Sequence, residues 1–241
     1  MIRVTIWNEY RHEKEMPEVA AIYPEGIHNE LKKALSKEND DFVIRAVAMD
    51  DPECGLPDSV LEDTDVLIWW GHAHHGNVPD ALAEKIADRV RKGMGFIALH
   101  SSHLSKPFLK LMGTSGRLNW RDGDRERLWT VAPGHPIAKG VPAYIDIPAE
   151  EMYGEPFGIP EPNRLVFIGW FAGGEVFRSG CCFLREAGRI FYFQPGHETN
   201  PTYKIPEIIK IIGNAVRWAY NPSADYSTDC TDCGHPAPLE K

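Results

Sequence analysis

The chain has 241 residues, a formal net charge of -9 and a sequence pI near 5.6. Hydrophobic residues make up 43% and charged residues 25%, an ordinary globular composition that excludes a disordered or fibrous protein. The acidic balance argues against nucleic acid as a partner, because a protein that binds the phosphate backbone needs a basic surface.

The N-terminal segment MIRVTIWNEY predicts an early strand and lacks the basic region, apolar run and cleavage site of a secretory signal. No apolar stretch approaches the roughly 20 residues that cross a bilayer. We therefore expect a cytoplasmic protein with no membrane partner. Five cysteines, an odd number, argue against a disulfide framework in a chain without an export signal.

Four apolar or β-branched runs in the first half of the chain predict strands, at residues 4–7, 42–47, 66–70 and 96–99. Continuous apolar runs are typical of parallel strands that helices cover on both faces. Apolar residues at helical spacing over 26–37 and 80–91 predict such helices. This alternation predicts a doubly wound, mostly parallel α/β sheet.

The second half of the chain reads differently. After a short helix candidate at 105–112, residues up to about 163 are rich in Gly, Pro and Trp, so we expect more loop than regular structure, with one strand at 128–131. Strands then follow at 164–170, 176–178, 182–185 and 190–193, separated by Gly173-Gly174, Ser179-Gly180 and Ala187-Gly188. Such short glycine-containing turns predict added antiparallel hairpins.

A closing helix is expected over 205–219, where apolar residues recur on one face before Asn221-Pro222. We expect one domain over residues 1–222 and a C-terminal tail over 223–241.

Histidines follow the predicted carboxyl ends of several strands, which is where open parallel sheets bind their ligands. His100 comes directly after an apolar strand, and His197 is followed by Glu198, whose carboxylate can orient an imidazole. These three residues are the first candidates for a site, and His72 and His103 come next. At each position the alternative is a hydrogen-bonded structural histidine.

Paired carboxylates and a phenol lie between residues 150 and 155. Because we expect an irregular loop there, Glu151, Tyr153 and Glu155 are candidates to face a ligand, with a solvated loop as the alternative. Three tryptophans of the loop-rich half offer indole faces on which sugar rings stack, with core packing as the alternative: Trp120, Trp129 and Trp170.

Cys230 and Cys233 have the two-residue spacing of a zinc knuckle. A closed site would need further ligands such as His235 or Cys54, and a disordered tail with two inert thiols is the alternative. The chain contains neither a Gly-x-Gly-x-x-Gly fingerprint nor a Walker phosphate loop, so no nucleotide cofactor is predicted.

Several long motifs, in order, resemble the ThuA-like, trehalose-utilisation family over residues 1 to about 220. They are WWGH at 69–72, GMGFIALHSSH at 93–103, GHPI at 134–137, EMYGE at 151–155 and FYFQPGHE at 191–198. The resemblance implies the class I glutamine amidotransferase-like fold, whose flavodoxin-like sheet agrees with the pattern above.

The resemblance also implies a comparison of sites. Amidotransferases of this superfamily place a cysteine nucleophile at the turn after a central strand, and a histidine with an acidic partner after a later strand. Here His100 stands at the turn, while His197 and Glu198 stand at the later position. Ser101 and Ser102 lie beside the turn, but no cysteine does, so the resemblance implies no glutamine hydrolysis through a thioester.

The expected function is therefore an enzyme of trehalose or disaccharide utilisation that acts on a sugar or keto-sugar. His100 and His197 would be an acid/base pair or would bind zinc, with Glu198 as the orienting group and Glu155 as a further carboxylate. The residues expected to contact the substrate are His72, His103, Glu151 and Tyr153. The alternative is a non-catalytic carbohydrate-binding or scaffold protein with a degenerate pocket. A homo-oligomer is compatible with the sequence.

Overall fold

A computed structural model of the chain describes residues 1–226 and 237–240. Its strands are β1 (Ile2–Asn8), β2 (Phe42–Ala48), β3 (Val66–Trp70), β4 (Gly95–Leu99), β5 (Asn119–Thr130), β6 (Tyr144–Gly154), β7 (Arg164–Phe171), β8 (Val176–Arg185) and β9 (Gly188–Phe193). Its α-helices are α1 (His12–Glu15), α2 (Pro17–Ile22), α3 (Ile27–Glu38), α4 (Asp58–Glu62), α5 (Asp80–Arg91), α6 (Lys106–Met112) and α7 (Pro206–Ala219). Short 3-10 turns occupy Pro52–Gly55, His75–Asn77, His100–Leu104, Pro136–Ala138 and Thr202–Lys204.

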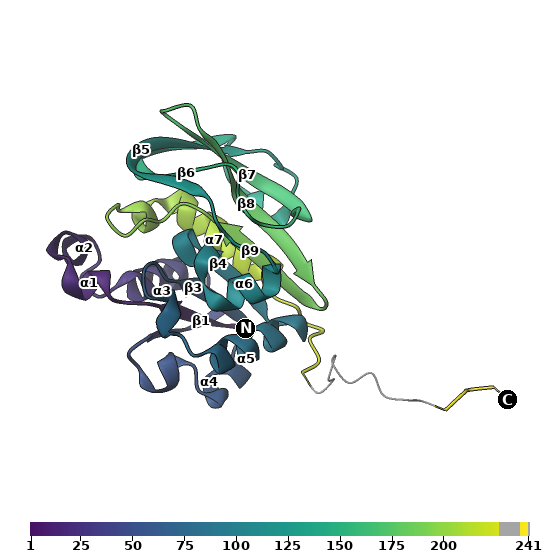
Figure 1. Cartoon of the computed structure of the whole chain (residues 1–241). Coiled ribbons are helices and arrows are strands. Elements are labelled where there is room, and N and C mark those ends of the chain that lie inside the picture. The colour runs from purple at the N-terminus through teal and green to yellow at the C-terminus, as the bar shows by residue number, and fades with distance from the viewer. Residues whose placement is uncertain (227–236, 241) are drawn as a thin grey trace.

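All nine of these strands form one sheet in the order β2-β1-β3-β4-β9-β8-β7-β5-β6 (Figure 1). The strands β2, β1, β3, β4 and β9 run parallel to one another. From β9 onward every neighbouring pair is antiparallel. The predicted fold class, a flavodoxin-like parallel sheet with antiparallel strands added in the C-terminal half, is confirmed.

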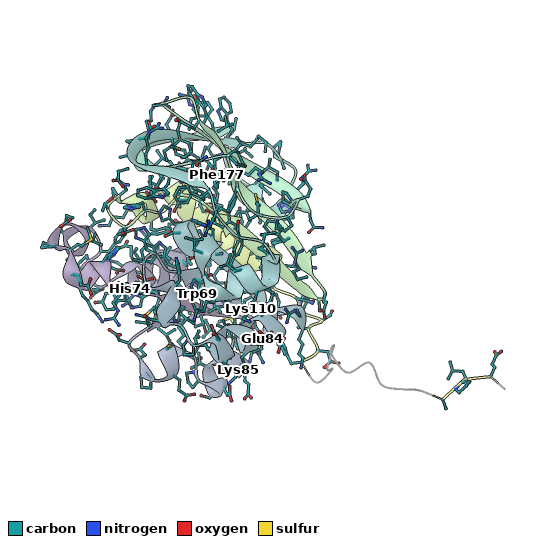
Figure 2. All side chains as sticks on the ribbon, viewed as in Figure 1. Trp69, His74, Glu84, Lys85, Lys110 and Phe177 are labelled. Atoms are coloured by element: carbon teal, nitrogen blue, oxygen red, sulfur yellow. The ribbon has the colours of Figure 1, made fainter. Side chains whose placement is uncertain are left out.

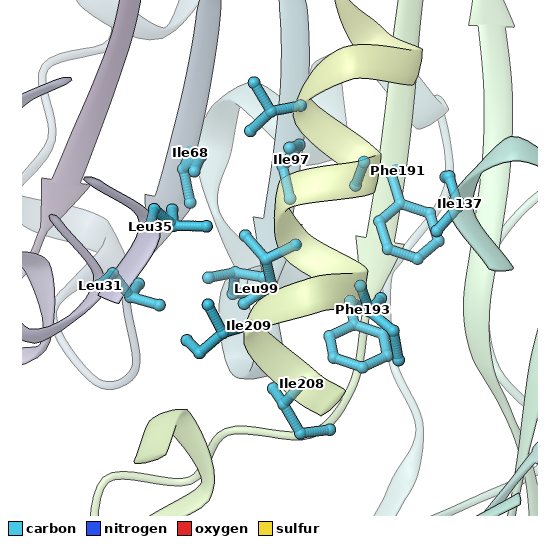
Figure 3. Close-up of a cluster of buried hydrophobic side chains, with 14 of the residues drawn as sticks. Leu31, Leu35, Ile68, Ile97, Leu99, Ile137, Phe191, Phe193, Ile208 and Ile209 are labelled. Atoms are coloured by element: carbon cyan, nitrogen blue, oxygen red, sulfur yellow. The ribbon is translucent and has the colours of Figure 1, made fainter. Parts of the chain in front are cut away.

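Two hydrophobic cores lie on opposite faces of the parallel half. Alternate residues of each strand point to opposite faces, so Ile68 and Ile97 pack with α3 and α7, while Trp69 packs with α4, α5 and α6. Figure 3 shows the first core, where Ile208 and other α7 side chains pack near Leu99 and Phe193. The continuous apolar runs of the sequence reflect this burial on both faces.

The second core contains a pair of stacked indoles. The Trp7 and Trp69 rings lie 3.7 Å apart at their centroids, and Trp69 is visible among the interior side chains in Figure 2. Outside this core, Lys110 on α6 forms an ion pair with Glu84 on α5 at 2.5 Å. The indole stack joins β1 to β3, and the ion pair joins the two helices α5 and α6.

The largest departure from the sequence prediction is the region up to residue 163. The structure forms two long antiparallel strands there, β5 and β6, where we expected mostly loop with one short strand. Most of β5 is charged or exposed, and register shifts between Arg121 and Asp124 and between Asp124 and Glu126 interrupt its alternation. A bulged, polar strand therefore lacks the period-two apolar pattern by which strands are recognised.

Two smaller expectations also need correction. The predicted turn at Ser179-Gly180 lies inside the continuous strand β8, where Gly180 leaves room for the ring of Phe167. The chain between β1 and α3 forms the short helices α1 and α2, which were not predicted. In the described part of the chain, no helix is long and apolar enough to cross a membrane.

Candidate functional site

Four of the parallel strands end at the same edge of the sheet, and each is followed by a histidine. His12 comes four residues after β1, His72 two after β3, His100 directly after β4 and His197 four after β9. Because β1 is flanked by β2 on one side and β3 on the other, this edge contains the switch in strand order at which such sheets bind ligands. The fold therefore gathers residues that lie up to 185 positions apart.

His100 is held in a strained turn. Its φ of 51° lies in the left-handed region that residues with a side chain rarely adopt. The ring is fully buried, and its Nδ1–H donates to the carbonyl of Gln194 at 2.8 Å. Nε2 therefore faces the Glu151 carboxylate, 3.0 Å from Oε2, while the Tyr153 ring stacks on the imidazole at 5.0 Å.

Glu198, which follows β9, contacts histidines that follow β1, β3 and β9 itself. Its Oε1 accepts a hydrogen bond from Nδ1 of His12 at 2.5 Å and lies 2.7 Å from Nδ1 of His72. Its Oε2 lies 3.7 Å from Nε2 of His197. The hydroxyl of Thr199, 2.7 Å from Nδ1 of His197, fixes that ring with Nε2 turned toward the carboxylates.

Glu151 reaches this cluster from the antiparallel half of the sheet. It lies on β6, and its Oε2 is 3.9 Å from Nε2 of His197 in addition to its contact with His100. Both Glu151 Oε2 and Glu198 Oε2 are buried and accept no well-aligned hydrogen bond from the described residues. Two carboxylate oxygens with unused acceptor capacity thus face imidazole nitrogens in the interior.

Two further buried glutamates anchor the loops that carry the histidines. Glu150 accepts hydrogen bonds from the backbone N–H groups of Gly196 and His197 at 2.8 and 2.9 Å, and from the Thr202 hydroxyl at 2.8 Å. Glu9 accepts from the backbone N–H groups of residues 72, 73 and 74 at 2.8 to 3.1 Å. These bonds place the His197 and His72 loops against the strand ends.

The surroundings shift the pKa values of the buried groups in different directions. Although burial disfavours a charged ring, the Glu151 carboxylate raises the pKa of His100 to about 9. Burial and the neighbouring charge of His100 lower the pKa of His197 to about 4. Burial opposes ionisation of Glu198, but its contacts with His12 and His72 hold the pKa of that carboxyl well below its usual range.

The donor atoms form three overlapping groups in which all ligand atoms lie within 4.8 Å of one another. The groups are His12, His72 and Glu198; His72, Glu151 and His197; and His100, His197 and Glu198. Two ligands of one zinc ion lie about 3–4 Å apart, given zinc–nitrogen and zinc–oxygen distances near 2 Å. These imidazole and carboxylate groups can therefore hold a divalent cation with small side-chain adjustments. We call these six residues the histidine cluster.

A cavity of about 290 Å³ opens onto the histidine cluster. Its inner wall contains His72, Ser101, Glu151 and Tyr153. Its outer wall contains side chains of β5 and of the loops around it.

Most of the site residues selected from the sequence come together. His72, His100, His197, Glu198 and Glu151 belong to the histidine cluster, and Tyr153 stacks on it.

Two selected residues lie outside the cluster. His103 lines the cavity, and its Nδ1–H donates to the Gly116 carbonyl at 2.7 Å. Glu155 pairs instead with Arg178 at 2.8 Å, since it lies beyond the end of β6, and the structure does not place it with the other carboxylates. Cys230 and Cys233 lie outside the described residues.

The expected conformation of residues 150–155 was wrong, and one residue of the cluster was missed. Residues 150–154 form the end of strand β6 and not an irregular loop, and this regular geometry turns Glu151 and Tyr153 to one face. His12 was not selected, although it lies among the polar residues that follow the first strand. The rule that ligands bind at strand ends would have found it.

The two serines beside the turn are bound to the backbone. Ser101 donates to the Gly71 carbonyl at 3.1 Å, and Ser102 donates to the Trp69 carbonyl at 2.9 Å. Neither hydroxyl is hydrogen-bonded to a histidine among these contacts, so neither is arranged as an activated nucleophile.

The model of the ThuA family, described as trehalose utilisation, matches residues 3–219. The chain belongs to the ThuA family. All six residues of the histidine cluster lie inside the matched range. No curated protein matches the chain.

Solved structures share the ThuA fold at low sequence identity. A protein from Parabacteroides merdae described as ThuA-like is 15% identical, with a TM-score of 0.68 and coverage of 90% of this chain and 89% of that one. A second such protein, from Bacteroides uniformis, is 17% identical, with a TM-score of 0.64 and coverage of 90% of each chain. A glutamine amidotransferase from Thermotoga maritima is 10% identical, with a TM-score of 0.53 and coverage of 90% and 97%. These likenesses establish the amidotransferase-like fold of the chain.

Proposed function

We propose that the protein is a divalent-metal-dependent enzyme that acts on a sugar or keto-sugar at the histidine cluster. The observation that carries this proposal is the convergence of four imidazoles and two carboxylates at one edge of the sheet, below an open cavity. Zinc is the cation we expect first, because imidazole and carboxylate are among its common ligands.

The donor set fits such a cation. Glu151 Oε2 and Glu198 Oε2 are buried with no well-aligned partner among the described residues, and a positive ion between them would supply one. His100 and His197 turn Nε2 to the same place, because Gln194 and Thr199 hold their other ring nitrogens. Such outer contacts are typical of metal-binding histidines. When bound, zinc would polarise a substrate carbonyl or lower the pKa of a bound water.

The same residues support proton transfer. A ring with a raised pKa, His100, lies 5.2 Å at its centroid from a ring with a lowered pKa, His197. Groups whose environments separate their pKa values in this way are suited to act as acid and base. The acid/base mechanism and the metal mechanism use the same histidines. They differ in one respect: in the metal mechanism a cation takes the place of the proton on His100.

Glutamine hydrolysis is not expected. The turn that holds the nucleophile in amidotransferases carries His100, and Ser101 and Ser102 donate to backbone carbonyls. Cys181 is buried, and burial raises the pKa of its thiol to about 12. A thiol with such a raised pKa supplies little thiolate at neutral pH.

A carbohydrate substrate is supported by the cavity and by the family. The described residues that line the cavity include hydroxyl, carboxylate and imidazole groups, which suit hydroxyl-rich molecules, and no lysine or arginine. The ThuA family model carries the description trehalose utilisation. A non-catalytic carbohydrate-binding protein would share these features, so turnover is the property that separates the two functions.

The experiment combines metal analysis with turnover. Purified protein would be assayed for bound zinc and incubated with trehalose, its keto derivative and simple hexoses, with products followed by chromatography. We expect His100→Ala and Glu198→Gln to lose turnover, and His135→Ala, a change at the start of a 3-10 turn outside the cluster, to keep it. Sugar binding without any chemical change in wild type would overturn the enzyme and support the binding protein.

A further inference from the structure

The outer wall of the cavity is formed by apolar and acidic side chains. It contains Leu104, Leu118, Trp120 and Asp122, next to the inner wall of the histidine cluster. We propose that Trp120, Leu118 and Asp122 form a second subsite that binds an uncharged sugar ring, so that the substrate is a glycoside of two rings. This proposal rests on the proposed function, because it assigns the reacting ring to the histidine cluster.

The register of β5 and β6 places this subsite beside the cluster. Trp120 pairs directly with Tyr153, and residues opposite one another in an antiparallel pair lie on the same face. Glu151 precedes Tyr153 by two residues and so shares that face. Asp122 lies at the bulge after Trp120, where the alternation is interrupted, but its side chain lines the same cavity as those of the other three residues. One face of a two-stranded ribbon thus supplies both a carboxylate of the cluster and the wall of the subsite.

Trp120 is unusually exposed for its residue type. Its exposed fraction is 62%, whereas its partner Tyr153 is 2% exposed against His100. Leu104, across the cavity wall, is 38% exposed. A large indole face left open to water beside a polar pocket has the form of a stacking platform, on which the apolar face of a pyranose ring packs. Asp122 offers carboxylate oxygens that accept hydrogen bonds from ring hydroxyls.

The charge of the cavity selects against anionic substrates. Asp122 and Glu151 are its carboxylates, and the described residues that line it include no arginine or lysine. A phosphate group binds well where guanidinium or ammonium groups neutralise it, and it is repelled by carboxylates. The outer subsite therefore fits an uncharged sugar ring and not a sugar phosphate.

The chain supplies a matched control. Trp129 lies on the same strand and is 39% exposed, but it packs beside Tyr144 with ring centroids 5.1 Å apart, and it does not line the cavity. Removal of Trp129 deletes a similar exposed indole without touching the subsite. Trp120→Phe keeps an aromatic face at the subsite.

The experiment measures Kd by titration calorimetry on zinc-loaded protein. The probes are trehalose, its keto derivative, glucose and trehalose 6-phosphate. We expect Trp120→Ala to weaken binding of the two-ring probes about tenfold, equivalent to about 1.4 kcal/mol, and to leave glucose binding unchanged. Trp120→Phe should recover most of this loss, and Trp129→Ala should match wild type. Trehalose 6-phosphate should bind wild type more weakly than trehalose does.

The outcomes separate this proposal from the proposed function. If Trp120→Ala binds trehalose as wild type does, or loses glucose equally, the subsite is refuted while zinc binding and turnover still stand. Tighter binding of trehalose 6-phosphate than of trehalose would refute an uncharged outer ring. If wild type retains zinc and binds neither two-ring probe, the subsite also fails. The proposed function is refuted by a different result, namely a wild-type protein that neither binds zinc nor turns over a sugar.

Discussion

Glu150 and Glu126 are two fully buried glutamates that lead to opposite predictions. Glu150 accepts from the backbone N–H groups of Glu151, Gly196 and His197 and from the Thr202 hydroxyl, at 2.8 to 3.0 Å. Glu126 has the Ser179 hydroxyl at 3.3 Å, and its Oε2 has no partner among the described residues. We expect Glu150→Gln to destabilise the fold and Glu126→Gln to leave it nearly unchanged at pH 4.5.

The magnitude follows from the donors around Glu150. An amide at this position keeps one oxygen and turns an NH2 group toward two of the four donors. In the better orientation the Thr202 hydroxyl rotates and accepts, while the Gly196 N–H is left without an acceptor. An orphaned buried N–H costs about 1–3 kcal/mol, and weakening the remaining charge-assisted bonds adds about 1 kcal/mol. The expected loss is therefore about 2–4 kcal/mol of unfolding free energy.

The contribution of Glu126 to stability depends on pH. Burial raises the pKa of Glu126 well above its usual range, so the folded state holds the neutral acid. Its stabilising contribution is complete below pH 4.5, the ordinary value, and is lost as the pH rises toward the raised pKa. Glutamine does not ionise, so Glu126→Gln should gain stability relative to wild type between pH 4.5 and pH 7.

The assay is urea unfolding of both variants, followed by tryptophan fluorescence at pH 4.5 and pH 7. A loss below about 0.5 kcal/mol for Glu150→Gln, which is ordinary for a surface change, would refute the anchoring role of Glu150. An equal loss in both variants would show that burial alone, and not the hydrogen bonds, sets the cost.

Three further predictions use other parts of the structure. Burial lowers the pKa of His28 to about 4, so protonation of this histidine favours the unfolded state as the pH falls. Between pH 7 and pH 5 the unfolding free energy of wild type should fall by about 2 kcal/mol more than that of His28→Gln, as measured by urea unfolding at both pH values. Gly196 has φ +137° and a Cβ there would overlap the Tyr203 hydroxyl, so Gly196→Ala should lower the melting temperature more than Gly174→Ala, where the added Cβ meets nothing. His12→Ala should weaken zinc binding about 10–100-fold in competition titrations, whereas His74→Ala, outside the cluster, should not.

The parallel half of the fold was predictable because its strands are buried on both faces. The runs at residues 66–70 and 96–99 match β3 and β4 almost residue for residue, and the helix at 80–91 coincides with α5. Strand ends then located His72, His100 and His197, since ligand sites at that edge follow from topology.

The antiparallel half was less predictable for physical reasons. The strand β5 is bulged and largely unburied, and half of its residues are charged, so its sequence resembles a loop. The pairing of β5 with β6 depends on contacts distant in sequence, and this pairing turns Glu151 into the cluster and Trp120 into the cavity wall. Local patterns do not encode that register.

The proposed function depends first on whether the histidine cluster binds zinc. The measurement uses a Cys230→Ser, Cys233→Ser chain, which removes the cysteine pair of the other candidate zinc site. This chain is compared with the same chain carrying His100→Ala and His197→Ala. Our prediction is stoichiometric zinc in the first chain and a loss of tight binding in the second. Equal zinc content in both chains, or none in the first after loading with excess zinc, would contradict it.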